Sequence, residues 1–451
     1  MNMQPLRPRL VAALLGLSFA SPALAEFEPT GLHLTWQRDP TTTMTVDWHL
    51  SPDQHADDQR HAISFRELDG DDDWQHADGQ GHDFPHSDRI IKRVELTDLE
   101  PGTMYEFRFG DDGRVYRLRT MPADNTEPVR FITGGDTRTQ GEWLDQTNRQ
   151  AMRYDPDFIL WGGDLAYADG RADRVDRWHE WFDINKATLI DDDGRVVPII
   201  VAMGNHEMVR GFFYNHDDYA PTDEWRESVA PYFYSIFAFP NHPGYGVLDF
   251  GNYLSIFALD TDHTTPIEGE QTDWLADALS ERTDVTHRIP VYHTPAFPSH
   301  RSYGSIYSQR VLHEWVPLFE RYGVRIAFEN HDHTYKRTHP IRNARVVAPD
   351  DREDDVDYHW VAGGIHSMLG EIDPVNGIVY VGDGCWGVGA REINNTPENT
   401  WYMAKAESKR HFIIVTLHNA HQHLLMVDED GEIIDEYPRT PWFEHRDAVR
   451  P

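Results

Sequence analysis

The chain has 451 residues and a formal net charge of −35, from 41 basic and 76 acidic side chains. Such a negative field repels nucleic acid and anionic membrane surfaces, so neither is an expected partner. Hydrophobic residues make up 39% and aromatic residues 12%, which excludes a disordered acidic chain. The acid-rich, lysine-poor composition suits an environment of high salt, where ions screen self-repulsion. The single cysteine, Cys385, excludes an internal disulfide.

The first 25 residues have the pattern of a secretory signal peptide. Arg7 and Arg9 precede the short apolar run LVAALLGLSFA, and a small-residue cleavage site ends at Ala25. The apolar run is about half the roughly 20 residues that a membrane span requires, so we expect cleavage rather than anchoring. The mature chain is therefore predicted to be exported, to the periplasm or outside the cell, without a membrane span.

Residues 26–122 are predicted to form an all-β domain. Short runs rich in β-branched and aromatic residues, such as GLHLTWQ, MTVDWHL and MYEFRFG, are separated by turns rich in Asp and Gly. Six or seven such runs indicate a small β-sandwich, and Trp36 and Trp48 are expected in its core. A polar linker with two prolines, MPADNTEP, follows at 121–128.

From residue 128 to 440 the pattern changes to alternating strands and helices, which indicates an α/β domain. Apolar runs such as VRFI, DFILW and VPIIVAM are expected to be strands buried on both faces. Helices are expected at 141–154, 174–185, 271–282 and 309–322. The aromatic segment 207–247 is expected to be a long loop with short helices. Beyond residue 355 strands, including YHWVAGG at 358–364, should complete the domain before a tail at 441–451.

Five of the predicted strands are each followed by side chains that are able to bind a metal ion. These side chains are Asp136, Asp164, Asn205 with His206 and Glu207, His293, and His331 with His333. In open α/β sheets ligands bind beyond the carboxyl ends of the strands, so we expect this set at one rim. Carboxylate, amide and imidazole donors without thiolate suit iron, manganese or zinc. Two metal ions bridged by a carboxylate form a clamp for hydrolysis at phosphorus.

His331 and His333 lie in the segment FENHDHTYKR, straight after an apolar run. On an extended segment residues i and i+2 point the same way, so the two imidazoles are placed to serve two adjacent metals. A single Gly-Gly-Asp is more often a turn, and a single histidine is more often a surface residue. The whole set, in order and each behind its own strand, is poorly explained by coincidence.

These ordered motifs resemble those of the purple acid phosphatases, within the metallophosphoesterase superfamily. They are GGDTR at 134–138, GDLAY at 163–167, GNHE at 204–207, YHTP at 292–295 and NHDH at 330–333. The runs LTWQRDPTTTMTVDW and VELTDLEPGTMYEFRFG are similar to the fibronectin-III-like domain of plant-type members. The resemblance therefore implies a fibronectin-III-like β-sandwich followed by an α/β metallophosphoesterase domain, with two packed β-sheets flanked by helices.

The resemblance also implies a set of metal ligands. The implied ferric site has the ligands Asp136, Tyr167 and His333, and the implied divalent site has the ligands Asn205, His293 and His331. Asp164 would bridge the two ions, and the divalent ion would be iron, zinc or manganese. Many superfamily members have a histidine where this chain has Arg138, so the iron site must rely on Tyr167. A phenolate is a hard anionic donor that favours ferric iron, and its charge transfer gives such enzymes their colour.

Four further positions bear on catalysis. His206 occupies the family position that touches the phosphate as a hydrogen-bond donor or proton source. His300 is a candidate for the acid that protonates the leaving oxygen, and the alternative is a solvent-facing loop histidine. Arg138 replaces a small glycine of the family's first motif, where it either binds a phosphate oxygen or pairs with a neighbouring acid. Asn330 replaces the usual glycine of the last motif and is expected to shift the next residue slightly.

The expected activity is hydrolysis of small phosphate monoesters by attack of a metal-bound hydroxide, without a protein nucleophile. The alternative is a phosphodiesterase of the same superfamily that acts on nucleotides or phospholipid headgroups, because its ligand set would be nearly the same. A different class is a binding protein, in which the β-sandwich docks to a cell-surface polymer and the α/β domain is vestigial. The complete set of implied ligands argues against that class.

Overall fold

The computed structural model describes residues 27–55, 58–70, 73–111, 113–343, 371–372 and 376–438. The predicted signal peptide, the predicted strand at 358–364 and the predicted C-terminal tail lie outside the described residues. Within the described ranges, no helix has the length and hydropathy that crossing a membrane requires.

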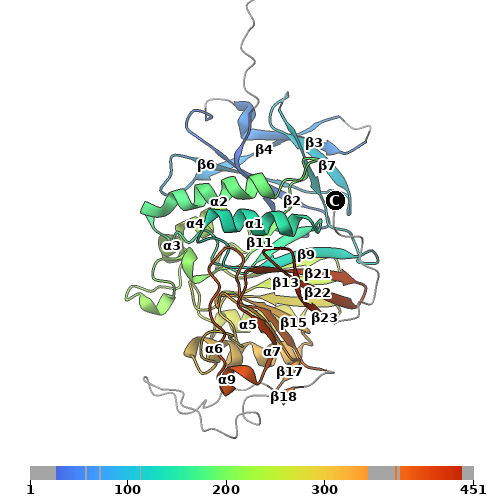
Figure 1. Cartoon of the computed structure of the whole chain (residues 1–451). Coiled ribbons are helices and arrows are strands. Elements are labelled where there is room, and N and C mark those ends of the chain that lie inside the picture. Colours follow the sequence, from blue (N-terminus) through green and yellow to red (C-terminus); the bar gives the residue numbers. More distant parts are fainter. Residues whose placement is uncertain are drawn as a thin grey trace, which may run out of the picture.

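The N-terminal part of the chain is a β-sandwich (Figure 1). Its strands are β1 (Thr30–Thr35), β2 (Met44–Leu50), β3 (Ala62–Glu67), β4 (Gln75–Asp78), β5 (Gln80–Asp83), β6 (Ile90–Leu96), β7 (Met104–Arg108) and β8 (Val115–Arg119). They form two antiparallel sheets, ordered β1-β2-β6-β5 and β4-β3-β7-β8. Trp36 and Trp48 are fully buried; Trp48 packs on Phe109 within the sandwich, whereas Trp36 packs on Phe158 and Phe250 of the α/β domain. Strands β4 and β5 escape the sequence pattern because the run QHADGQGHD is polar, and their side chains are largely exposed.

The rest of the described chain is an α/β domain built on two sheets. The six-stranded sheet has the order β11-β10-β9-β21-β22-β23, with β9 (Val129–Gly134), β10 (Phe158–Trp161), β11 (Ile199–Val201), β21 (His411–His418), β22 (His421–Asp428) and β23 (Ile433–Tyr437). The seven-stranded sheet has the order β12-β13-β14-β15-β19-β16-β20, with β12 (Gly246–Phe250), β13 (Leu254–Ala258), β14 (His287–Val291), β15 (Ile326–Glu329), β16 (Tyr335–Thr338), β19 (Val379–Gly382) and β20 (Met403–Glu407). The buried apolar runs form parallel strands in both sheets, as predicted.

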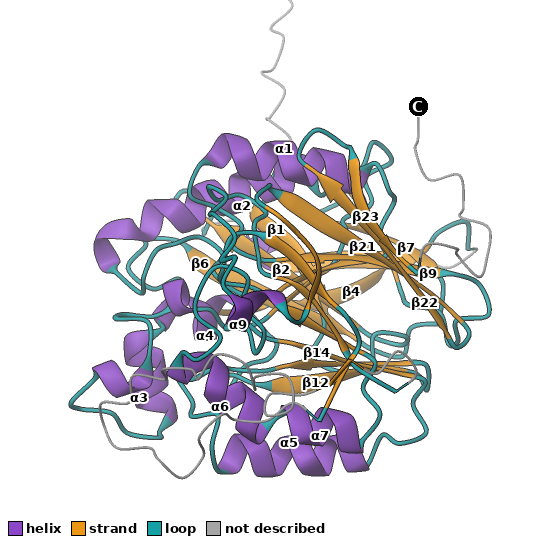
Figure 2. Cartoon of the chain, turned by 60° about the horizontal axis from the view of Figure 1, so that its bottom comes forward, coloured by secondary structure: helices purple, strands orange, loops and turns teal. Residues whose placement is uncertain are grey.

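Helices cover the outer faces of the two packed sheets (Figure 2). One side carries α1 (Gly141–Met152) and α2 (Val175–Thr188), and the other carries α5 (Glu270–Ser280), α6 (Ile306–Glu314) and α7 (Val316–Arg321). The predicted helix at 309–322 is therefore wrong in one respect, because it is two helices. Pro317 lies in the first turn of α7, where its missing N–H is tolerated, and it cannot continue α6. The aromatic segment contains the short helices α3 (Asp223–Val229) and α4 (Pro231–Ile236), as expected.

Two buried histidines make the fold sensitive to acid. Burial lowers the pKa of His411 to about 4 and the pKa of His287 to about 4. In the unfolded chain a histidine protonates near its ordinary pKa of about 6.5. The unfolded state therefore binds more protons than the folded state between about pH 6.5 and 4, and stability falls as the pH falls through that window.

We expect the substitution His411→Gln to weaken this acid sensitivity. The unfolded chain then binds one proton fewer in this pH window, while the folded chain binds as many as before. The slope of unfolding free energy against pH should therefore fall by up to about 1.4 kcal/mol per pH unit. Denaturant titrations between pH 6.5 and 4 measure this slope. His76→Gln, at an exposed position of β4, is the matched control and should leave it unchanged. Equal slopes for the two variants would contradict the assignment to His411.

Candidate metal centre

All seven predicted ligands gather at one rim of the α/β domain. Asp136 follows β9, Asp164 and Tyr167 follow β10, Asn205 follows β11, His293 follows β14, and His331 and His333 follow β15. Strands β9 to β11 are parallel neighbours in one sheet, and β14 and β15 are parallel neighbours in the other. The site therefore lies where the carboxyl edges of the two packed sheets meet, which is the position that the strand-end rule predicts.

Three of the side chains form a first cluster of ligand atoms. Oη of Tyr167 lies 3.1 Å from Oδ1 of Asp136 and 3.2 Å from Nε2 of His333. Nε2 of His333 lies 3.0 Å from the same carboxylate oxygen of Asp136. A phenol oxygen, a carboxylate oxygen and an imidazole nitrogen thus converge within one cation's reach, and these donor types suit iron.

A second cluster is centred on His293. Its Nε2 lies 3.2 Å from Oδ1 of Asn205, 3.1 Å from Nδ1 of His331 and 3.1 Å from Oδ2 of Asp164. Its Nδ1 is 2.9 Å from the carbonyl oxygen of Gly162. Because a carbonyl can only accept, Nδ1 carries a proton, and Nε2 is the nitrogen that faces the cluster. Nε2 would therefore be the atom that binds a metal.

Asp164 is the residue whose charge reaches both clusters. Its Oδ1 accepts the backbone N–H of His206, at 2.7 Å. Its Oδ2 is buried and accepts no hydrogen bond from any described residue. Ligand atoms of Asp164, His293 and His331 all lie within 4.8 Å of one another. A buried carboxylate oxygen without a donor is costly on its own, so its position fits a bound cation.

The charged groups of the site shift one another's pKa values strongly. Burial alone would raise the pKa of Asp164, but His293 and His206 hold it well below its usual range. Burial lowers the pKa of His293, but Asp164 and Asp136 outweigh it and raise the value to about 9. Burial, together with the carboxylates of Asp136 and Asp164, raises the pKa of Tyr167 well above its usual range. Tyr167 would therefore ionise only beside a cation.

Five of the seven ligand candidates have a positive φ angle, although none of them is glycine. They are Asp136 (56°), Asp164 (55°), Tyr167 (56°), His331 (77°) and His333 (57°). The left-handed region costs a non-glycine residue about 1–2 kcal/mol, and such residues gather where a site requires an unusual backbone. These five residues lie close together in space. A ligand site explains why all of them have a strained backbone, whereas packing alone does not.

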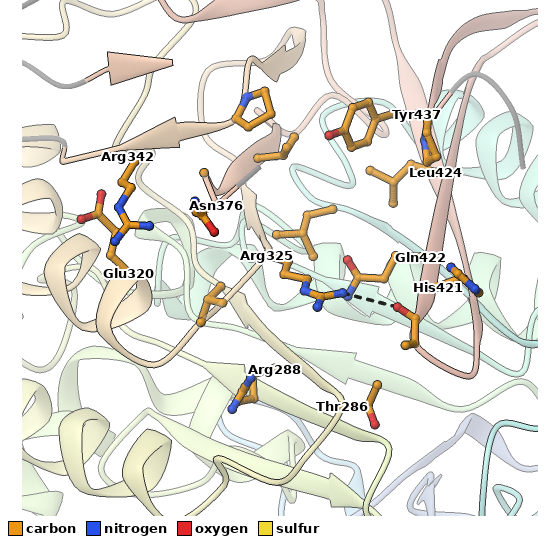
Figure 3. A pocket seen from close by; sticks show the side chains of 18 of the residues that line it. Thr286, Arg288, Glu320, Arg325, Arg342, Asn376, His421, Gln422, Leu424 and Tyr437 are labelled. Carbon is orange, nitrogen blue, oxygen red and sulfur yellow. Dashed lines mark hydrogen bonds between the residues drawn. The ribbon is translucent and has the colours of Figure 1, made fainter. Parts of the chain in front are cut away.

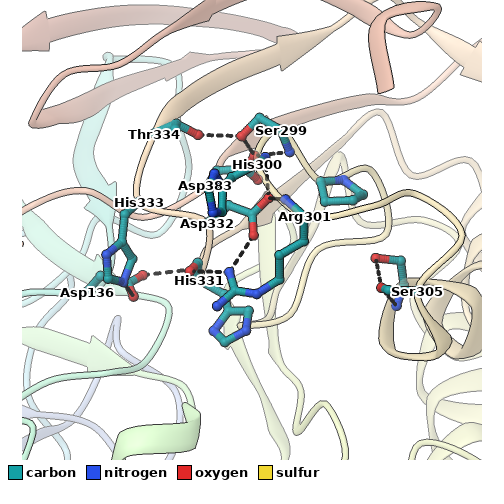
Figure 4. Close-up of polar contacts among 12 residues, drawn as sticks. Asp136, Ser299, His300, Arg301, Ser305, His331, Asp332, His333, Thr334 and Asp383 are labelled. Atoms are coloured by element: carbon teal, nitrogen blue, oxygen red, sulfur yellow. Dashed lines mark hydrogen bonds and ion pairs between the residues drawn. The ribbon is translucent and has the colours of Figure 1, made fainter. Parts of the chain in front are cut away.

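The expectation of an extended segment at His331 and His333 is wrong. Both residues are in the left-handed region, and β15 ends before them, at Glu329. They face different clusters, His331 through Nδ1 and His333 through Nε2. Asp332 between them is buried and points to the opposite side, where it accepts hydrogen bonds from the backbone of His300 and from both backbone and side chain of Arg301 (Figure 4). The tight turn, rather than strand alternation, separates the two imidazoles.

Asn330 explains the paired glycines of the first two motifs. Its side-chain amide donates to the carbonyl of Tyr292, at 3.0 Å. A Cβ added to Gly135 would lie 2.4 Å from its Oδ1, and a Cβ added to Gly162 would lie 1.7 Å from its Nδ2. The amide of Asn330 thus fills the space that Gly135 and Gly162 leave open because they lack a Cβ. Asn330 therefore packs the last motif, NHDH, against the first two, GGDTR and GDLAY.

Asp169 and Glu207 support His206 and Asp164. Asp169 accepts from Nδ1 of His206 at 2.5 Å and pairs with Arg174, so Nε2 of His206 is turned to the site, 3.9 Å from Oδ2 of Asp164. Glu207 is not turned to the ligand clusters. Its carboxylate accepts the backbone N–H groups of Asp164, Leu165 and Gly204. The sequence signal for Asp169 was its place two residues after Tyr167.

The other two catalytic candidates lie in less direct positions. Arg138 pairs with Glu180 of α2, which is one of the two outcomes expected for it. His300 has its Nδ1 2.7 Å from the carbonyl oxygen of Glu392 and is only partly exposed. Next to it, Arg301 donates to the carbonyl of His331, at 2.9 Å, and its side chain is about one third exposed. Arg301 brings a positive charge beside the second cluster, and no motif of the sequence marks it.

Comparison with known proteins agrees with this fold and site. Residues 29–125 match the family model "Purple acid Phosphatase, N-terminal domain", and residues 133–335 match "Calcineurin-like phosphoesterase". An uncharacterised protein of Mycobacterium tuberculosis is 26% identical over 403 residues, covering 78% of this chain and 71% of that protein. Purple acid phosphatase 21 of Arabidopsis thaliana is 28% identical over 274 residues, but these cover only 58% of this chain and 56% of the plant protein.

A solved structure shows the same fold. The purple acid phosphatase PPD1 from yellow lupin seeds superposes with a TM-score of 0.68 at 17% identity, covering 91% of this chain and 74% of that one. The chain therefore carries a calcineurin-like phosphoesterase domain preceded by a purple acid phosphatase N-terminal domain, and it is similar to proteins named purple acid phosphatase. It is a phosphoric ester hydrolase by family, and the predicted β-sandwich followed by an α/β domain is confirmed. The family implies a binuclear metal centre, which the two ligand clusters fit.

Proposed function

We propose that this protein is an exported phosphatase that hydrolyses phosphate monoesters at a centre of ferric iron and a divalent ion. The observation that carries the proposal is the pair of ligand clusters on either side of Asp164. Asp136, Tyr167 and His333 are the proposed iron ligands, and the tyrosine oxygen is what favours ferric iron. When bound, two such ions neutralise phosphoryl oxygens and activate water for in-line attack.

The residues of the chain have separate tasks around such a centre. Asn205, His293 and His331 are the proposed ligands of the divalent ion, and Gly162 fixes the ring of His293 through Nδ1. His206 presents Nε2 beside Asp164, where it is placed to donate a hydrogen bond to a phosphate oxygen. Its orientation depends on Asp169.

The protonation of the leaving oxygen is assigned to the loop after β14. We retain His300 as the proposed acid, with Arg301 as the neighbouring positive charge. The guanidinium of Arg138 donates to Glu180. We therefore propose that Arg138 supports the first cluster indirectly and does not bind the phosphate.

The test of the proposed reaction compares a monoester with a diester. The metal-loaded protein should hydrolyse p-nitrophenyl phosphate faster than bis-p-nitrophenyl phosphate, and solvent oxygen-18 should enter the phosphate through P–O cleavage. Faster hydrolysis of the diester would replace the monoesterase by the phosphodiesterase alternative. Failure of solvent oxygen to enter the phosphate would contradict direct attack by water.

We expect Tyr167→Phe to remove the visible absorption band of the iron-loaded protein. The substitution keeps the ring, which stacks on His206 with 4.2 Å between centroids, and deletes only the donor oxygen. Absorption spectra of equal concentrations of both proteins measure the change. Tyr154→Phe, which removes a hydroxyl on the α1 side of the fold, is the control and should keep the band. An unchanged spectrum in Tyr167→Phe would show that this phenol is not an iron ligand.

An aromatic stack beside the second cluster bears on the leaving group. The ring of Phe212 stacks on Tyr214 and Tyr307, with centroids 5.3 Å and 5.0 Å away. It also lies 5.0 Å from the ring of His263, which is 5.6 Å from His293. The three stacked rings are partly or largely solvent-exposed and so are accessible to a ligand. The stack favours esters whose alcohol carries a planar ring, including nucleotides.

We expect Phe212→Leu to raise KM for an aryl phosphate by about 3- to 10-fold, since an aromatic pair contributes about 0.5–1.5 kcal/mol. KM for glycerol phosphate, whose alcohol has no ring, should stay the same, as should kcat for both substrates. Phe213→Leu changes the adjacent ring, which packs on Tyr219, and is the control. An equal rise of KM for both substrates would contradict a role in recognising the leaving group.

Export is proposed from residues 1–25 alone. Expression of the whole chain in a bacterium with a periplasm should yield a protein that begins near Glu26 outside the cytoplasm. Recovery of the full-length chain from the cytoplasm or the membrane fraction would contradict it.

A further inference from the structure

A cavity that is separate from the metal centre lies in the α/β domain (Figure 3). Its volume is about 810 Å³, and it lies between the amino ends of β14, β15 and β19 and the start of β22. The ligand candidates His293 and His331 follow the carboxyl ends of β14 and β15. The strands therefore separate the two sites, by about 17 Å over the five residues from Arg288 to His293.

The cavity is basic, although the chain is strongly acidic. Arg288, Arg321, Arg325 and Arg342 line it, and Glu320 is the one acid among its described lining residues. The chain as a whole has 76 acidic and 41 basic residues. Basic residues outnumber acidic ones in the cavity lining, whereas acidic residues outnumber basic ones in the whole chain. The overall composition therefore does not explain why four arginines line this cavity.

Two of the arginines come from neighbouring strands. Val291 of β14 pairs with Phe328 of β15, and Arg288 lies three residues before the first, whereas Arg325 directly precedes β15. Burial and the charge of Arg325 lower the pKa of Arg288. The arrangement therefore has a cost that an anion between the two guanidinium groups would remove.

Among the described residues, only the more distant charge of Asp284 acts in favour of a charged Arg288. Arg288 donates to the carbonyls of Arg282 and Thr283, its Nε is buried without a hydrogen-bond partner, and Arg325 donates to the carbonyl of Ala420. Neither guanidinium is in an ion pair with a described acid. Both therefore keep N–H groups available for an anion that enters the cavity.

We propose that this cavity binds a small anion that carries two or more neighbouring phosphate groups. Guanidinium groups bind phosphate oxygens in pairs of parallel hydrogen bonds, and four arginines around one cavity offer more donors than a single phosphate can use. The volume is in the usual range for small-molecule sites, about 300–1,000 Å³. The net negative charge of the whole chain opposes binding of a long polyanion, so a small anion is the expected ligand.

The probe for this site is methylenediphosphonate, whose P–C–P link resists hydrolysis. Calorimetry with the metal-loaded, full-length protein at low ionic strength should detect binding at two places, the metal centre and the cavity. Arg325→Ala should weaken the cavity binding about tenfold or more, because a hydrogen bond to a charged group is lost. Arg153→Ala, an exposed arginine at the end of α1, is the control and should bind like the wild type.

Two further variants distinguish binding in the cavity from binding at the metal centre. Asp164→Ala, which we expect to lack metal, should retain the cavity binding. Hydrolysis of p-nitrophenyl phosphate should be unchanged in Arg325→Ala, which shows that the variant is folded, and Arg342→Ala on another wall serves as the second variant. Unaltered affinity in both arginine variants, or loss of all binding in Asp164→Ala, would overturn the proposal, since all anion binding would then belong to the metal centre.

Discussion

Asp164→Ala is expected to lose both metal ions and to reduce phosphatase activity by about a thousandfold or more. The carboxylate is the proposed bridge, and its Oδ2 is buried, without a hydrogen-bond donor, 3.1 Å from Nε2 of His293. Metal ions supply several kcal/mol of transition-state stabilisation. A loss of about 4 kcal/mol corresponds to about a thousandfold in rate. Metal analysis and kcat/KM of the purified variant measure both effects.

The control for this prediction is Asp173→Ala. Asp173 lies nine residues further along the same connection, pairs with Arg171 at the surface and is about two thirds exposed. Its loss should change neither metal content nor rate. Metal content and activity like the wild type in Asp164→Ala would refute the bridging role, and loss of only one ion would assign Asp164 to a single cluster.

Lys336→Met is expected to destabilise the protein by about 3–5 kcal/mol, because it leaves buried carboxylates without their cation. Lys336 is fully buried and pairs with Glu329, and its Nζ lies 3.0 Å from Oδ1 of Asp383. Burial works against its charge, but Asp383 and Glu329 outweigh burial and raise the pKa of Lys336. Denaturant unfolding of the variant measures the loss.

The same ion cluster ties together the loops that carry the ligands. Glu329 also accepts the backbone N–H of Ala296, and Asp383 accepts that of Ser299, both in the loop after His293. The carbonyl of Asp383 accepts the backbone N–H of His333 at 2.7 Å. We therefore expect Lys336→Met to bind metal more weakly as well as to unfold more easily.

A surface lysine provides the matched control. Lys405→Met breaks an exposed pair with Glu407 and should cost less than about 1 kcal/mol. Replacing Glu329 and Asp383 by Gln and Asn in the Lys336→Met background should recover part of the stability, because no charge is then left buried alone. If Lys336→Met were as stable as Lys405→Met, the buried cluster would not have the importance that we assign to it.

Much of the architecture was predictable from local patterns. The apolar runs that precede Asp136, Asp164 and His293 predict strands buried on both faces, and the strand-end rule places their polar neighbours at one rim. Tyr167 was different, because nothing in its spacing marks it as a ligand and only the family resemblance singled it out. Its positive φ and its contacts with Asp136 and His333 give a physical basis to that choice.

The errors came from features that a local pattern does not encode. The turn at His331 has a left-handed backbone, which strand alternation cannot predict. The strands β4 and β5 are polar and depend on pairing with β3 and β6. Asp169, Arg301 and Lys336 act through partners that are distant in sequence, so their roles appear only when the fold brings those partners close.

The most direct test of the account is the metal content and visible spectrum of the purified protein. The two ligand clusters and the phenol of Tyr167 predict about two metal ions per chain, with iron among them and a broad visible band that disappears in Tyr167→Phe. A protein that holds a single ion, or two ions without iron and without colour, would contradict the proposed ferric-tyrosinate centre.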